Sequence, residues 1–89
     1  MIVEFDKSFL KSINKINHQP TLDKIRKVTA VLEENTSIQE VSDVKKLTGF
    51  DSFYRIRLGD YRPGFEMISS DKVRLIIVAH RKDIYRKFP

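Results

Sequence analysis

The chain contains no cysteine and only three glycines and three prolines. Without cysteine, neither a disulfide nor a thiolate metal site can form, and a reducing compartment does not threaten the protein. The scarcity of glycine and proline, together with 40% hydrophobic residues, excludes the composition of a disordered tail. Because a chain of 89 residues can fill only one hydrophobic core, we expect a single domain over residues 1–89.

Long apolar runs are also missing. The longest, Leu75 to Ala79, is too short to cross a bilayer, and the first six residues lack the basic segment and the apolar stretch of a signal peptide. We therefore expect a cytoplasmic protein that has no membrane partner.

The signatures of common enzymes are absent as well. The two histidines, His18 and His80, lie far apart in the sequence, and neither an HExxH motif nor a paired-carboxylate spacing is present. There is no GxSxG elbow for acyl transfer and no glycine-rich phosphate loop. We therefore expect neither a metal nor a cofactor.

The charge that is present is unevenly distributed. Residues 1–44 hold six Lys/Arg and seven Asp/Glu, a net charge of −1, whereas residues 45–89 hold eleven and five, a net charge of +6. Such polarisation favours a polyanionic partner, which can be RNA, DNA or an acidic protein segment. A solvated basic surface explains the charge equally well.

Hydrophobic spacing predicts helices in the first half of the chain. After a short strand around residues 2–5, Asp6 is typical of an N-cap for a helix over residues 7–17. Pro20 suits the first turn of a second helix that ends near Glu34, so the two helices should form a hairpin. Residues 35–48 lack a sustained period and are expected to connect the halves, with room for one short turn or strand.

From residue 53 the hydrophobic period changes to two, which indicates β-strands. On the first strand the apolar side chains face one way and Arg55 and Arg57 face the other. After a turn at Gly59 and Asp60, a strand over residues 61–68 follows, in which Pro63 predicts a bulge or an unpaired edge.

A further turn leads to the most apolar strand, residues 73–79, and the tail over residues 81–88 is expected to be a short helix or an extended end. The order βααβββ predicts an α+β fold, with an N-terminal strand and a helical hairpin packed on a small, mainly antiparallel β-sheet. Tyr54, Tyr61, Phe65 and Met67 are expected in the core. With both helices on one face, the other face of the sheet should be open.

Cationic side chains are expected to converge on that open face, because neighbouring strands lie about 4.8 Å apart. The candidates are Arg55, Arg57, Arg62, His80 and Arg81. Arginine binds two phosphate oxygens at once, so such a group can hold one phosphodiester.

RNA cleavage without a metal requires attack by the 2′-OH, stabilisation of transition-state charge and a proton for the departing 5′ oxygen. Arginines supply the charge, and His80 is a candidate for proton exchange because histidine titrates near neutral pH. Alternatively, His80 is a strand-end residue that caps a carbonyl. Tyr85 is suited either to stacking on a base or to packing the C-terminal tail.

The residues with these candidate roles resemble the RelE toxins of the RelE/ParE superfamily, and with the order of elements the resemblance covers nearly the whole chain. The matching segments are Val44-Lys45-Lys46-Leu47-Thr48-Gly49, Tyr54-Arg55-Ile56-Arg57-Leu58-Gly59-Asp60-Tyr61-Arg62 and Ala79-His80-Arg81-Lys82-Asp83-Ile84-Tyr85. The resemblance implies a type II toxin–antitoxin toxin that cleaves mRNA in the ribosomal A site, leaving a 2′,3′-cyclic phosphate and a 5′-hydroxyl. Its implied partners are mRNA, rRNA and a cognate antitoxin that blocks it.

The resemblance also implies roles for single residues. Arg62 matches the arginine that stabilises the scissile phosphate, Arg81 the arginine assigned to charge stabilisation or leaving-group protonation, and Tyr85 the tyrosine that orients the nucleotide. Arg55 and Arg57 stand where well-studied RelE toxins have lysines. Because arginine is a poor general base, both are expected to bind phosphate, and His80 is expected to take over proton transfer.

Three further expectations follow. Lys45 and Lys46 are expected to bind RNA phosphates together with Arg55 and Arg57. Pro63 replaces the aliphatic residue usual in the family. The antitoxin should be a small protein with an acidic or amphipathic disordered segment.

Two other functions remain open for the same fold. A ParE-like protein inhibits DNA gyrase by binding and performs no RNA chemistry, and an inactive family member only binds its antitoxin. The arrangement of Arg62, Arg81 and Tyr85 favours the ribonuclease, because a gyrase inhibitor needs no phosphate-centred site.

Overall fold

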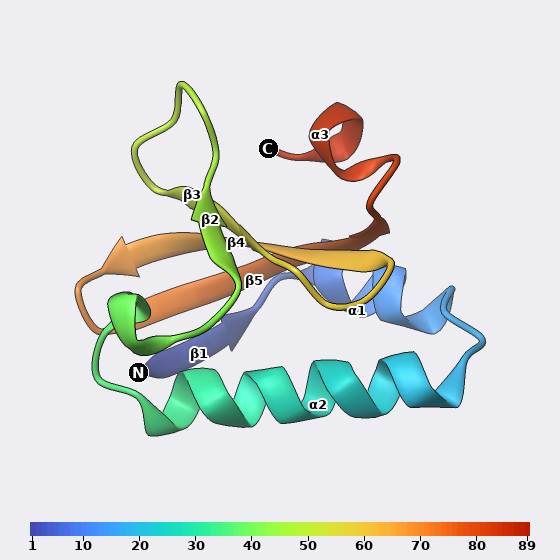
Figure 1. The fold of residues 1–89 in the computed structure, drawn as a ribbon, viewed down its shortest axis with the longest axis horizontal. Helices are drawn as coiled ribbons and strands as arrows, with labels where there is room; N and C mark the ends of the chain where they lie inside the picture. Colours follow the sequence, from blue (N-terminus) through green and yellow to red (C-terminus); the bar gives the residue numbers. More distant parts are fainter.

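Five strands and three α-helices make up the computed structural model, which describes residues 1–89 (Figure 1). In chain order they are β1 (Ile2–Phe5), α1 (Lys7–Asn14), α2 (Gln19–Glu34), the 3₁₀ turn η1 (Ile38–Glu40), β2 (Val44–Lys46), β3 (Phe53–Ile56), β4 (Tyr61–Ser69), β5 (Lys72–His80) and α3 (Ile84–Lys87). No helix is long and apolar enough to span a membrane.

The two long helices begin at the caps their sequences predict. The Asp6 carboxylate accepts a hydrogen bond from the Ser8 amide at 3.1 Å, and Pro20 lies in the first turn of α2. His18 caps α2, with Nδ1 accepting from the Thr21 amide at 3.3 Å. Helix α1 ends at Asn14, three residues earlier than expected, because the chain must become extended at His18 to form this cap.

The strands form one sheet in the order β1-β5-β4-β3-β2. Strand β1 runs parallel to β5, since the helical hairpin carries the chain back across the sheet, and every other pair is antiparallel. The α+β, mainly antiparallel architecture is thus confirmed. Within the expected connection, residues 44–46 form the short edge strand β2, in which Lys45 lies opposite Arg55.

Pro63 pairs with Val78 inside the ladder, and the bulge near it lies in the neighbouring strand β5 rather than at Pro63 itself. Gly64 pairs with Ile77 but Phe65 pairs with Leu75, so Ile76 has no partner on β4. An unpaired residue reverses the alternation of side chains along its strand. The residues of β5 beyond Ile76 therefore face opposite sides from those that simple alternation predicts.

The main core lies between the sheet and helices α1 and α2, and most of its residues are almost fully buried. The four side chains expected in the core all contact it. The buried residues of this core are Phe9, Ile25, Leu32, Ile38, Val41, Ile56, Phe65, Val73, Leu75 and Val78.

A second, smaller core covers part of the opposite face, so the expectation of an open face is wrong there. Helix α3 lies on that face (Figure 1) and packs Ile84 and Phe88 against Leu47 and Ala79. Gly64 makes this possible, because a Cβ at Gly64 would lie 2.8 Å from the Phe88 ring. The absent side chain lets the ring rest directly on β4.

Candidate functional site

Four arginines gather around β3 and β4 near helix α3. Arg55 lies in β3, Arg62 in β4, and Arg57 and Arg81 lie just beyond the ends of β3 and β5. The pKa of Arg62 is lowered, first by desolvation and then by the positive charges of Arg55 and Arg57, with a smaller effect of Arg81. The guanidinium groups are therefore close enough to repel one another, as expected for a phosphate-binding surface.

Arg62 is held in place by the turn between β3 and β4. Its Nη1 donates hydrogen bonds to the backbone carbonyls of Gly59 at 2.6 Å and Tyr61 at 2.9 Å. Gly59 has a φ of +60°, a left-handed conformation that suits glycine. The turn thus fixes one edge of the guanidinium and leaves its other nitrogens to bind a ligand.

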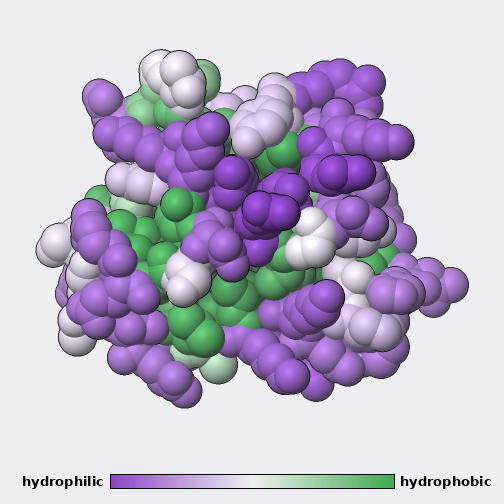
Figure 2. All heavy atoms as spheres, viewed as in Figure 1, coloured by the Kyte–Doolittle hydropathy of each residue, from purple (hydrophilic) through white to green (hydrophobic).

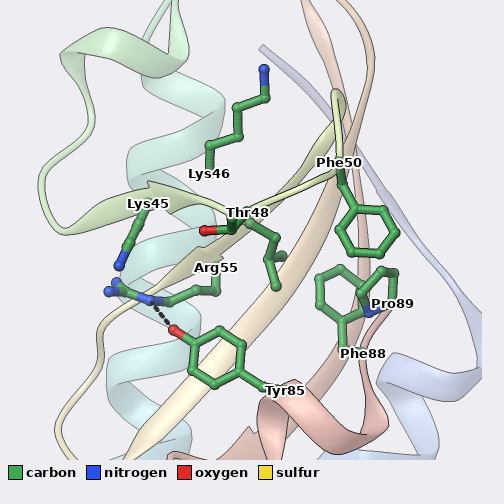
Figure 3. Close-up of a pocket in the computed structure, with 9 residues that line it drawn as sticks. Lys45, Lys46, Thr48, Phe50, Arg55, Tyr85, Phe88 and Pro89 are labelled. Carbon is green, nitrogen blue, oxygen red and sulfur yellow. Dashed lines mark hydrogen bonds between the residues drawn. The ribbon is translucent and has the colours of Figure 1, made fainter.

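Tyr85 meets Arg55 at the centre of the cluster. The Nε of Arg55 donates to the Tyr85 hydroxyl at 3.3 Å (Figure 3). The Nη1 of Arg55 donates to the backbone carbonyl of Asp43 at 3.2 Å. The hydrogen bond from Arg55 is the largest cause of a lowered pKa at Tyr85, and the charges of Lys45 and Arg62 add to it. Tyr85 is 60% exposed, so its ring is available to a ligand.

An open cavity of about 480 Å³ lies beside this pair. Figure 3 shows that the Lys45 side chain runs toward the Arg55 guanidinium, whereas the Lys46 side chain points away from it. Phe50 and Phe88 line the other side of the cavity. Cations at one side and aromatic rings at the other match the phosphate and the base of a nucleotide.

Sequence reasoning missed Phe50 and left Phe88 unassigned. Phe50 is 45% exposed and its ring meets Phe53 edge-on, with centroids 5.9 Å apart. A lone aromatic residue after Gly49, in a polar turn, was the available signal. Phe88 is buried and holds α3 on the sheet, so it shapes the cavity mainly as a structural residue.

The structure does not bring His80 to the arginine cluster. The bulge at Ile76 turns His80 toward the face covered by α1 and α2, where its ring meets the Tyr61 ring edge-on with centroids 5.8 Å apart. Its Nδ1 accepts a hydrogen bond from the Lys82 amide at 3.2 Å, so it caps an amide at the strand end. Arg62 pairs with Ala79 and faces the other side.

Arg81 stays at the rim of the cluster. Its amide donates to the Asp60 carbonyl at 2.7 Å, and its Nε lies 3.7 Å from the Asp60 carboxylate. Both side chains are largely exposed, so this ion pair adds little stability and a phosphate can displace it.

Comparisons with known proteins agree with the fold. The family model that describes the ParE toxin of type II toxin–antitoxin systems (parDE) matches residues 3–85 of the sequence. Toxin RelE3 of Methanocaldococcus jannaschii is 38% identical over 94 residues, which covers 100% of both chains.

Two solved toxin–antitoxin complexes contain similar chains. A chain of the RelB–RelE antitoxin–toxin complex from Methanococcus jannaschii is 31% identical, with a TM-score of 0.79 and coverage of 97% of this chain and 99% of that one. A chain of the intact E. coli RelBE complex is 26% identical, with a TM-score of 0.62 and coverage of 89% and 94%. This protein belongs to the RelE/ParE superfamily of type II toxin–antitoxin toxins.

Proposed function

We propose that this toxin is a metal-independent endoribonuclease that cleaves mRNA in the ribosomal A site. The observation that carries the proposal is the cluster of Arg55, Arg57, Arg62 and Arg81 around Tyr85. Mutual repulsion among the guanidiniums is relieved when a phosphodiester binds between them, and the relief grows as charge develops in the transition state.

Each residue of the cluster has a proposed role. Arg62, which is partly desolvated, stabilises the charge on the scissile phosphate. Arg55 and Arg57 bind phosphate oxygens, and Arg81 leaves Asp60 to add charge at the rim. Tyr85, held by Arg55 in the free protein, orients the nucleotide. Lys45 and Lys46 extend the basic surface toward mRNA and rRNA, and a ribosomal partner implies action in the cytoplasm.

Cleavage of a reporter mRNA on programmed ribosomes tests this function. We expect the wild type to cut within A-site codons, as mapped by primer extension, and Arg62→Ala to lose at least about 100-fold in rate. The matched control is Arg26→Ala, because Arg26 is an exposed arginine on α2, away from the cluster. Intact mRNA in the presence of wild-type toxin that still arrests growth would exclude the ribonuclease.

A ParE-like activity is the second candidate, since the matching family model describes ParE toxins. Such a toxin would inhibit gyrase without cleaving RNA. A supercoiling assay separates the two functions, because only a gyrase inhibitor lowers supercoiling by purified gyrase while leaving mRNA intact.

We also propose that a cognate antitoxin neutralises this toxin, as the RelB–RelE complexes suggest. A groove of about 340 Å³ between α2 and β3 has an apolar floor that includes Val28, Val31 and Ile56. At its rims the cations Lys24, Lys27 and Arg57 outnumber the acidic Glu40 and Asp43. Figure 2 shows hydrophobic atoms exposed between hydrophilic side chains on this face of the molecule. An acidic amphipathic segment of the antitoxin matches both the apolar floor and the cationic rims.

A further inference from the structure

We propose that Lys45 is a catalytic residue that donates a proton to the departing 5′ oxygen of the cleaved RNA. This inference rests on the ribonuclease function proposed above, and it assigns a proton-donor role that the proposal gives to none of the arginines. Its basis is the position of Lys45 on the edge strand β2.

The β2–β3 pairing places Lys45 beside the centre of the site. Lys45 lies directly opposite Arg55 in the antiparallel register, so both side chains project from the same face of the sheet. Figure 3 shows the Lys45 side chain running toward the Arg55 guanidinium and the Tyr85 hydroxyl. The charge of Lys45 also contributes to the lowered pKa of Tyr85, which agrees with a short separation.

The neighbouring lysine is excluded by the alternation of the strand. Lys46 lines the same cavity, but it pairs with Tyr54, whose ring stacks on Phe65 in the main core. Its side chain points away from Arg55 in Figure 3. Only Lys45 therefore brings an ammonium group to the cluster.

The arginines of the cluster are poor proton donors to an alkoxide. A guanidinium holds its proton too tightly to act as an acid near neutral pH, which applies to Arg55, Arg62 and Arg81. His80 faces the other side of the sheet. The Tyr85 hydroxyl accepts a hydrogen bond from the Arg55 Nε, which holds it in the position proposed above for orienting the nucleotide. An ammonium carries three donor protons and becomes neutral after giving one up.

The proposed step balances as follows. The 2′ oxygen attacks phosphorus and forms a bond to it, while its proton passes to solvent water. The bond between phosphorus and the 5′ oxygen breaks, and the 5′ oxygen takes the electron pair and a proton from the Lys45 ammonium. The products are a 2′,3′-cyclic phosphate and a 5′-hydroxyl, and the neutral Lys45 amine regains its proton from solvent.

A substrate with a better leaving group distinguishes proton donation from charge stabilisation. The probe is an mRNA on programmed ribosomes in which sulfur replaces the bridging 5′ oxygen at the scissile linkage. A thiolate leaves without being protonated, so this substrate does not need a general acid. Single-turnover rates are measured for the wild type, Lys45→Arg and the control Lys7→Arg, an exposed lysine on α1.

We expect Lys45→Arg, which keeps the positive charge, to cleave the ordinary mRNA about 100-fold more slowly than the wild type. On the sulfur-bridged mRNA its rate should match that of the wild type within a few-fold, and Lys7→Arg should match the wild type on both substrates. Retained thermal stability of Lys45→Arg verifies that the variant is folded.

Two outcomes would overturn the role of Lys45 and leave the ribonuclease intact. One is an unchanged rate of Lys45→Arg on ordinary mRNA. The other is an equal loss on both substrates, which would mean that Lys45 only positions or neutralises the phosphate. Failure of the wild type to cleave either substrate would instead overturn the ribonuclease function itself.

Discussion

Arg55 and Tyr85 lie 30 residues apart in the chain and meet in a 3.3 Å hydrogen bond that joins β3 to α3. The contact depends on a series of packing interactions. Gly64, opposite Arg55 in the sheet, leaves room for the Phe88 ring, and Phe88 and Ile84 hold α3 against β5. The short helix then presents Tyr85 to the arginine cluster. A buried glycine and a buried phenylalanine thus position an exposed site.

Gly64→Ala should disturb the site from within the second core. The added Cβ would lie 2.8 Å from the Phe88 ring, so the ring must move and α3 with it. We expect a loss of about 1–3 kcal/mol in the free energy of unfolding, measured with urea, and slower mRNA cleavage.

The double variant Gly64→Ala/Phe88→Ala tests the cause of this effect. Phe88→Ala alone should cost about 3–5 kcal/mol, because it empties a buried position. Since the clash vanishes with the ring, the double variant should be destabilised by less than the sum of the single changes. Strict additivity would show that the Gly64–Phe88 contact is not the cause.

The ionisation of Tyr85 should depend on Arg55. The folded protein lowers the pKa of Tyr85, mainly through the hydrogen bond from Arg55. Because the pKa of Tyr85 is lower in the folded state than in the unfolded state, ionisation of Tyr85 stabilises the fold. This stabilisation is fully present above the unfolded pKa and is lost as the pH falls through the folded pKa. Its contribution is small because the side chain is largely exposed.

Phenolate absorbance measures that dependence. The difference between wild type and Tyr85→Phe isolates the titration of Tyr85 from those of the other two tyrosines. We expect Arg55→Ala to move this titration to higher pH, toward the ordinary value for tyrosine. A titration unaffected by Arg55→Ala would contradict the contact.

His80→Ala should leave mRNA cleavage within a few-fold of the wild type. The side chain lies on the face covered by α1 and α2, against Tyr61, and does not reach the arginine cluster. Loss of the ring contact should cost about 1 kcal/mol of stability, measurable by thermal unfolding. A rate reduced 100-fold in a stably folded variant would restore His80 as the proton-transfer residue.

Val31→Glu should weaken antitoxin binding without affecting cleavage. Val31 is 37% exposed in the groove between α2 and β3, so glutamate is tolerated by the fold but repels an acidic segment. We expect the Kd for the cognate antitoxin, measured by calorimetry, to rise at least about tenfold. Leu10→Glu is the control, because Leu10 is similarly exposed on α1 outside this groove. Equal affinities of wild type and Val31→Glu for the antitoxin would show that the antitoxin binds outside this groove.

The sequence predicted the elements of this fold better than it predicted the faces of the sheet. Caps such as Asp6 and breakers such as Pro20 act locally, and both are found where expected. Pro63 was expected to place a bulge or an unpaired edge in its own strand, but it pairs with Val78 and the nearby bulge lies in β5. The bulge position at Ile76 depends on pairing between strands, which no local pattern records.

That single unpaired residue explains why His80 was expected among the arginines. Simple alternation from Val73 and Leu75 would place His80 on the polar face, but the bulge reverses the alternation before the strand ends. The packing of Phe88 on the sheet could not be predicted from the sequence either, since it depends on the space left by Gly64, which is far from Phe88 in the chain. The bulge in β5 does not change the side of the sheet on which Arg55, Arg57 and Arg62 lie, because these residues are in or next to β3 and β4. Tyr85 joins them because α3 places it there.

The most direct test of the central claim is the chemistry of the mRNA ends produced by purified toxin on programmed ribosomes. We expect cuts within the A-site codon that leave a 2′,3′-cyclic phosphate and a 5′-hydroxyl, with the wild type active and Arg62→Ala inactive. Intact mRNA under the same conditions, or equal cleavage by Arg62→Ala, would contradict the claim that the arginine cluster is a ribonuclease site.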